Sequence, residues 1–161
     1  MAAQLKAWPS PTARTRGGRG PSPAIVRSAA VLAPLRYEEV ALDPSVLHSQ
    51  VEKAFNDGDV DALVDLYEPD ARMMRDDGSV AVGPEEIRDI WSGFVAMGGR
   101  ISLTTHYAVG SGDVALLSNS WTYEGDGMTF SSTTAEVARR QDDGSWRYVI
   151  DNPYSAGEAA P

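Results

Sequence analysis

Hydrophobic residues between positions 43 and 97 recur at the three- and four-residue intervals that place them on one face of a helix. We predict one helix from Asp43 to Gly58, a second from Asp59 to Pro69, and a third from about Pro84 to Met97. The residues that would form their buried faces are Leu47, Val51, Ala54, Phe55, Leu63, Leu66, Tyr67, Ile87, Ile90, Trp91 and Phe94. Each predicted helix begins at a capping residue or a proline, so local chemistry sets where it starts.

Strand-like runs fill the rest of this region and the C-terminal half. The short runs Ala71–Arg75 and Val80–Val82 flank Asp77-Gly78, a dipeptide typical of hairpin turns. Four longer runs follow, each separated from the next by a glycine-containing turn: Ile101–Val109, Val114–Glu124, Met128–Arg140 and Trp146–Asp151. The pattern predicts an α+β fold in which a curved antiparallel sheet wraps around N-terminal helices.

The first 36 residues have a different character from the rest of the chain. They contain five prolines, three glycines and six basic residues but no acid. We interpret residues 1–40 as a basic tail that is disordered or results from a start codon assigned too early, or as an organelle-targeting segment. Residues 43–155 are predicted to form one domain, which would be cytoplasmic unless the tail is a transit peptide.

Composition excludes several functional classes. Since all 23 acids and only eight basic residues lie after position 36, the domain would repel a phosphate backbone, and we expect no nucleic-acid partner. The absence of cysteine removes disulfides and thiolate chemistry, and two histidines far apart in the sequence argue against a zinc site. Acid-rich turns lack the spacing of a calcium loop, and no glycine-rich phosphate loop is present. We therefore predict no metal, no cofactor and, with no long apolar run, no membrane span.

Several local phrases resemble the SnoaL-like, or nuclear transport factor 2-like, superfamily, which includes ketosteroid isomerase and polyketide cyclases. These phrases are Val51–Asp59, Ala62-Leu63, Leu66-Tyr67, Pro69–Ala71, Gly83–Ile87 and Asp143–Arg147. The resemblance covers about residues 45–154 and implies a cone-shaped fold with a cavity beneath the helices. It also implies a homodimer. The fold supports many activities, so the resemblance alone assigns none of them.

Two residues are candidates for proton transfer. Asp151 ends the last predicted strand, and a carboxyl group in an apolar cavity has a raised pKa and can act as acid or base. Alternatively, Asp151 caps the turn into Asn152-Pro153. His106 lies within a predicted strand and could donate a hydrogen bond or shuttle a proton. Its alternative position is on the solvent or dimer face.

Aromatic and sulfur-containing side chains are candidates for contacts with a ligand. They are Tyr67, Met73, Trp91, Phe94, Trp121 and Tyr123, and each of them could equally be core packing. Two functions remain open on this basis. The first is a cofactor-independent isomerase or cyclase acting on a small hydrophobic substrate, and the second is a non-catalytic ligand-binding or dimeric interaction module.

Overall fold

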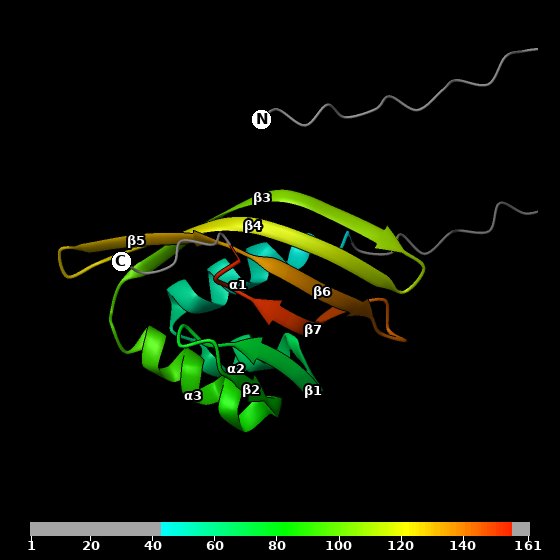
Figure 1. Cartoon of the computed structure of the whole chain (residues 1–161), viewed down its shortest axis with the longest axis horizontal. Coiled ribbons are helices and arrows are strands. Elements are labelled where there is room, and N and C mark those ends of the chain that lie inside the picture. Colours follow the sequence, from blue (N-terminus) through cyan, green and yellow to red (C-terminus); the bar gives the residue numbers. More distant parts are fainter. Residues whose placement is uncertain (1–42, 156–161) are drawn as a thin grey trace, which may run out of the picture. The chain divides into compact units, whose positions relative to one another are not determined.

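The computed structural model describes residues 43–155, and the predicted N-terminal tail lies outside the described residues. Helices and strands follow one another as the hydrophobic pattern predicts, which confirms the α+β class (Figure 1). The elements are α1 (Val46–Asp57), α2 (Val60–Asp65), β1 (Tyr67–Met74), β2 (Val80–Val82), α3 (Gly83–Val95), β3 (Arg100–Ser111), β4 (Val114–Gly125), β5 (Met128–Thr133), β6 (Ala135–Arg140) and β7 (Trp146–Asn152).

One curved sheet carries the fold, with strand order β2-β1-β7-β6-β4-β3 and β5 paired with β4. Figure 1 shows the long strands β3 and β4 arching over the helices, which lie on the concave side of the sheet. The meander from β3 to β7 is antiparallel as predicted, but β1 joins β7 in parallel. The sheet is therefore mixed, and its parallel pair joins the first strand, β1, to the last strand, β7.

Local hydrogen bonds set the helix boundaries. The Asp43 side chain accepts from the Ser45 backbone N–H at 2.9 Å, and α1 begins after this turn at Val46 rather than at Asp43. Asp59 caps α2 as predicted, accepting from the Ala62 N–H at 2.9 Å. The prediction that α2 runs on to Pro69 is wrong, because the helix ends at Asp65 and β1 begins two residues later.

The predicted strand Met128–Arg140 is two strands in the structure. It divides at Thr134, where β5 and β6 lie against different parts of β4. The hairpin before it turns at Asp126 and Gly127, whose φ angles of 50° and 76° are those of a type I′ turn. A run of suitable residues does not reveal such a division, because it depends on which part of β4 each half of the run pairs with.

Two β-bulges change which side chains face inward. In β3, Thr105 pairs with Asn119 and Tyr107 with Ser118, so His106 is the extra residue. In β7 the register shifts at Val149, where Tyr148 pairs with Ala138 and the next paired residue is Ile150. Simple alternation groups Asp151 with Arg147 and Val149, but the bulge puts it on the inward face with Tyr148.

The core lies between the concave face of the sheet and the helices, and aromatic rings dominate one end of it. Phe94 of α3 is surrounded by rings whose centroids lie 4.8–6.2 Å from its own. These rings belong to Phe55, Trp91, Trp121, Tyr123 and Phe130. No helix within residues 43–155 is both long and apolar enough to cross a membrane.

Candidate functional site

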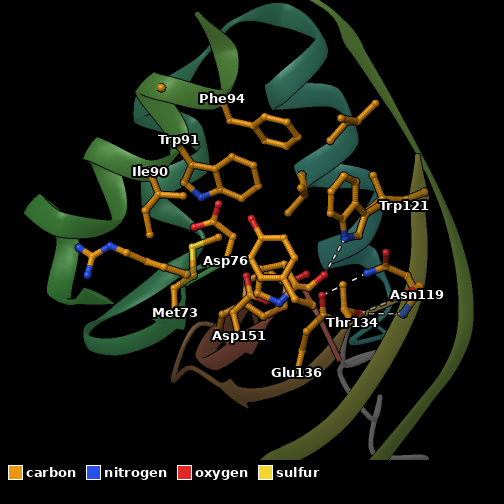
Figure 2. Close-up of a pocket in the computed structure, with 18 of the residues that line it drawn as sticks. Met73, Asp76, Ile90, Trp91, Phe94, Asn119, Trp121, Thr134, Glu136 and Asp151 are labelled. Carbon is orange, nitrogen blue, oxygen red and sulfur yellow. Dashed lines mark hydrogen bonds between the residues drawn. The ribbon is translucent and has the colours of Figure 1, made fainter. Parts of the chain in front are cut away.

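A cavity of about 400 Å³ lies between α3, the end of β1 and the concave face of the sheet (Figure 2). Its walls are mainly apolar and aromatic. Polar side chains lie both on the sheet, where they include Asn119, Glu136 and Asp151, and toward α3 and the end of β1, where they include Asp76 and Asp89. A space of this size and character is typical of small-molecule sites.

Four of the residues predicted to contact a ligand line the cavity, namely Met73, Trp91, Phe94 and Trp121. The other two lie outside its lining. Tyr67 is buried behind Asp151 and donates a hydrogen bond to it. Tyr123 is fully buried and donates its hydroxyl hydrogen to the Met97 carbonyl at 3.1 Å. Both tyrosines therefore support the wall from behind.

Asp151 lies on the cavity wall with only 5% of its surface exposed. Its Oδ2 accepts a hydrogen bond from the Tyr67 hydroxyl at 2.6 Å, while its Oδ1 has no hydrogen-bond partner among the described residues. Burial raises the pKa of Asp151 to about 7, and the negative charge of Glu136 adds to this effect. The Tyr67 hydrogen bond works in the opposite direction and lowers this pKa. Near neutral pH, Asp151 can thus both accept and release a proton.

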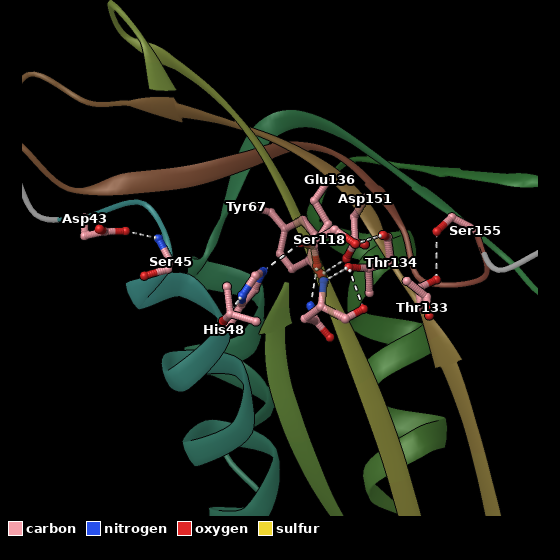
Figure 3. Close-up of polar contacts among 12 residues, drawn as sticks. Asp43, Ser45, His48, Tyr67, Ser118, Thr133, Thr134, Glu136, Asp151 and Ser155 are labelled. Carbon is pink, nitrogen blue, oxygen red and sulfur yellow. Dashed lines mark hydrogen bonds and ion pairs between the residues drawn. The ribbon is translucent and has the colours of Figure 1, made fainter. Parts of the chain in front are cut away.

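Glu136 lies beside Asp151, since the two residues are paired across β6 and β7. His48 of α1 donates from Nε2 to Glu136 Oε2 at 2.8 Å (Figure 3). Asn119 donates from Nδ2 to Glu136 Oε1 at 3.1 Å. The second ring nitrogen of His48 lies 2.7 Å from the Thr105 hydroxyl. Both oxygens of Glu136 therefore have partners, whereas among the described residues the Asp151 carboxyl group has one hydrogen bond, from the hydroxyl of Tyr67.

Sequence reasoning missed His48, Glu136 and Asn119, although each followed a readable pattern. His48 is three residues before Val51 and seven before Phe55, on the buried stripe of α1. Glu136 alternates with Ala138 on the inward face of β6. A polar residue within an apolar stripe was the available signal in each case.

His106 lies away from the cavity. As the bulge residue of β3 it is exposed, and its Nε2 lies 2.8 Å from the Ser120 hydroxyl. The structure does not bring His106 and Asp151 together, so the two predicted proton-transfer residues do not form one site. The buried histidine near the cavity is His48 instead.

Three buried polar atoms on the cavity-lining residues have no hydrogen-bond partner among residues 43–155: Trp91 Nε1, Asn119 Oδ1 and Asp151 Oδ1. Such atoms are costly in a folded protein unless a ligand or water satisfies them. Within the same residues, no three His, Asp or Glu side chains are grouped as metal ligands would be. The site is thus suited to hydrogen-bonding an organic molecule.

In a comparison with protein families, residues 48–149 match the SnoaL-like domain. Among solved structures, an NTF-2 like protein of unknown function from Shewanella oneidensis has a TM-score of 0.61 and 20% identity, covering 68% of this chain and 94% of its own. A ketosteroid isomerase-like protein from Erwinia carotovora atroseptica has a TM-score of 0.58 and 19% identity, covering 72% and 95%.

A protein with a cystatin-like fold from Nostoc punctiforme has a TM-score of 0.62 and 18% identity, covering 74% of this chain and 92% of its own. No curated protein sequence matches the chain. At these identities the structural likeness demonstrates a shared fold, and the choice of function depends on the residues of the cavity.

Proposed function

The chain belongs to the SnoaL-like domain family, and we propose that it is a cofactor-independent enzyme that transfers a proton within a small hydrophobic molecule. Asp151 acts as both acid and base in this proposal. The reaction class is isomerisation or a related cyclisation, in which a proton leaves one atom of the substrate and a proton returns at another.

The observation that carries the proposal is the state of the Asp151 carboxyl group. It is buried on the wall of an apolar cavity, its Oδ1 has no hydrogen-bond partner within residues 43–155, and its pKa is raised to about 7. A general acid or base is most effective when its pKa lies near the working pH. A carboxyl group with a purely structural role would more often have both oxygens paired, as Glu136 does.

Three side chains have separate roles in the proposed reaction. The Asp151 carboxylate takes a proton from carbon next to a carbonyl group, and the resulting carboxylic acid returns a proton at a second carbon. Tyr67 is a positioning residue, because its hydroxyl holds Asp151 Oδ2. Trp91 Nε1, a buried donor that makes no hydrogen bond of ordinary geometry within residues 43–155, would hydrogen-bond the substrate oxygen as negative charge develops there.

One structural relative supports the reaction class in a limited way. The Erwinia protein is described as ketosteroid isomerase-like, and that activity is a proton transfer next to a carbonyl group. The description belongs to that protein, and the shared fold makes the same class of reaction a reasonable first test for this chain.

Conversion and its dependence on Asp151 test the proposal directly. Cyclic ketones, epoxides and polyketide-like compounds are screened for thermal stabilisation of the protein, and each hit is incubated with it and followed by NMR. We expect Asp151→Asn to bind a converted hit but to reduce turnover about 100-fold or more. The control is Asp113→Asn, the same change at an exposed carboxylate outside the cavity lining. Equal turnover by the wild type and Asp151→Asn would disprove the role of Asp151.

A second variant distinguishes a positioning role of Tyr67 from a purely structural one. Tyr67→Phe removes the hydrogen bond that lowers the pKa of Asp151, so the pH at which activity is half-maximal should rise. A purely structural role for Tyr67 would lower activity without moving the pH profile.

We also infer that the chain forms a homodimer through the outer face of its sheet. Exposed apolar side chains gather there, including Tyr107, Val109, Leu116 and Ile150. Monomeric proteins rarely leave such a patch uncovered. The same surface supports the alternative of a dimeric binding module, which would bind hits from the screen and convert none of them.

A further inference from the structure

The acids on the cavity wall outnumber the cations. Asp76, Asp89, Glu136 and Asp151 all line the cavity, and Arg75 is the one lysine or arginine among its described lining residues. Arg75 is already paired with Glu86, with its Nη2 3.0 Å from Glu86 Oε2. The wall therefore presents a negative potential that repels anionic ligands.

Two of these acids form no ion pair within residues 43–155. Asp76 follows β1 and Asp89 belongs to α3, and neither takes part in an ion pair among the described residues. Both are exposed, so they lie where the cavity opens to solvent. Figure 2 shows the Asp76 side chain directed into the space between Trp91 and Asp151. Glu136 differs, because His48 is paired with it.

Buried atoms further inside indicate what kind of molecule would complete the site. Asp151 Oδ1 and Asn119 Oδ1 accept no hydrogen bond from the part of the chain that the structure describes, and both residues are 95% buried or more. A ligand that satisfies them brings N–H or O–H groups. The pKa of Tyr154 at the opening is also raised, first by burial and then by the charges of Asp76 and Asp151. That tyrosine is thus within the same negative field.

We propose that the cavity selects a small hydrophobic molecule carrying a protonated amine, with the ammonium group held by Asp76 and Asp89 at the opening. The apolar body lies between the rings of Trp91, Phe94 and Trp121, which also attract a cation through their faces. The inference rests on the proposed function, since it names the substrate class of the same cavity.

Three probes of equal size and different charge test this selection on the full chain. They are 2-(1-naphthyl)ethylamine, the corresponding alcohol and 1-naphthylacetate, each titrated by isothermal calorimetry at pH 7.5. We expect the amine to bind about tenfold more tightly than the alcohol, with the carboxylate weakest, because ion pairing and cation–π contacts add to the same apolar burial. The preference should diminish as salt is added.

Variants of the acids at the opening test which residues hold the ammonium group of the amine. Asp76→Asn combined with Asp89→Asn should reduce the affinity for the amine to that for the alcohol, while Asp113→Asn, the same change outside the cavity lining, should leave it unchanged. Equal affinity for amine and alcohol, tighter binding of the carboxylate, or no binding of any probe would overturn the inference. So would a preference for the amine that survives the double variant.

These outcomes are separate from those of the proton-transfer proposal. A neutral ketone that is converted in an Asp151-dependent manner, together with equal binding of amine and alcohol, would leave the enzyme proposal intact and remove the amine preference. Tight amine binding without conversion of any amine or ketone would support the preference and favour a binding module.

Discussion

Two rows of side chains cross the same sheet one residue apart, and they face opposite sides. The inner row, read from β2 to β3, is Ala81, Met73, Asp151, Glu136, Leu117 and Ala108. The outer row consists of their sequence neighbours Val82, Arg72, Ile150, Val137, Leu116 and Val109. The inner row includes two buried acids, whereas the outer row includes exposed apolar side chains, which is the reverse of the usual distribution.

Within the inner row, Asp151 and Glu136 are 5% and 3% exposed, whereas Leu116 and Ile150 in the outer row are 47% and 48% exposed. A monomer that only had to fold would gain stability from the reverse arrangement. Each face therefore carries residues that an isolated monomer does not need. We interpret Asp151 as a group that serves a ligand, with Glu136 held beside it by His48 and Asn119. The exposed apolar side chains of the outer row are interpreted as a surface that serves a partner.

The largest expected effect comes from breaking the polar network of the inner face. His48→Leu leaves Glu136 Oε2 buried without its donor, and we expect the free energy of unfolding to fall by about 3–5 kcal/mol. Guanidinium unfolding followed by tryptophan fluorescence measures the change.

A matched double variant, His48→Leu with Glu136→Leu, should recover part of this loss because no buried charge then remains unpaired. If His48→Leu is as stable as the wild type, the pair does not stabilise the fold as argued.

The next-largest effect is expected at Asp151 in the inner row. The pKa of Asp151 is 3.8 in the unfolded reference and about 7 in the fold, so the folded state binds more protons between these values. Wild-type stability should then fall as pH rises from about 4 to 7. Asp151→Asn removes this cost, and at pH 8 we expect a gain of about 2 kcal/mol that disappears by pH 4.

The gain is smaller than the whole pKa difference implies, because the new amide brings buried donors of its own. Urea unfolding at pH 4 and pH 8 measures it, with Asp113→Asn as the control. A constant difference between Asp151→Asn and wild type at both pH values would contradict a raised pKa.

A smaller effect on stability is expected at the outer row. Leu116→Lys places a charge in the middle of this exposed surface, and we expect dimers to separate while the stability of each monomer changes by less than about 1 kcal/mol. Light scattering coupled to size-exclusion chromatography measures the mass. Ser92→Lys on the exposed side of α3 is the control. A monomeric wild type would refute the partner interpretation.

The smallest effect is expected at His106, which sequence reasoning placed among the catalytic candidates. Because it is exposed at a bulge and contacts Ser120, we expect His106→Ala to alter stability by less than about 0.5 kcal/mol. Turnover of any hit from the screen should be unchanged. A loss of activity comparable to that of Asp151→Asn would return His106 to the site.

About half of the candidate site could be read from the chain. Asp151 and wall residues such as Trp91 and Trp121 stood out because strands and helices with a clear period carried them. Glu136 and His48 did not, because the contact between them joins residues 88 positions apart. Nothing in local spacing reports that a buried histidine of the first helix meets a glutamate of the sixth strand.

The sequence by itself determined the three helices, the Asp59 cap, the glycine-containing turns and the α+β class, because hydrophobic period and turn chemistry act over a few neighbouring residues. Only the tertiary structure decided which side chains share the cavity. Bulges at His106 and Val149 each reverse the alternation of their strand, and the parallel pairing of β1 with β7 places Met73 beside Asp151. A one-residue shift exchanges inside for outside, and it is selected by the curvature of the whole sheet.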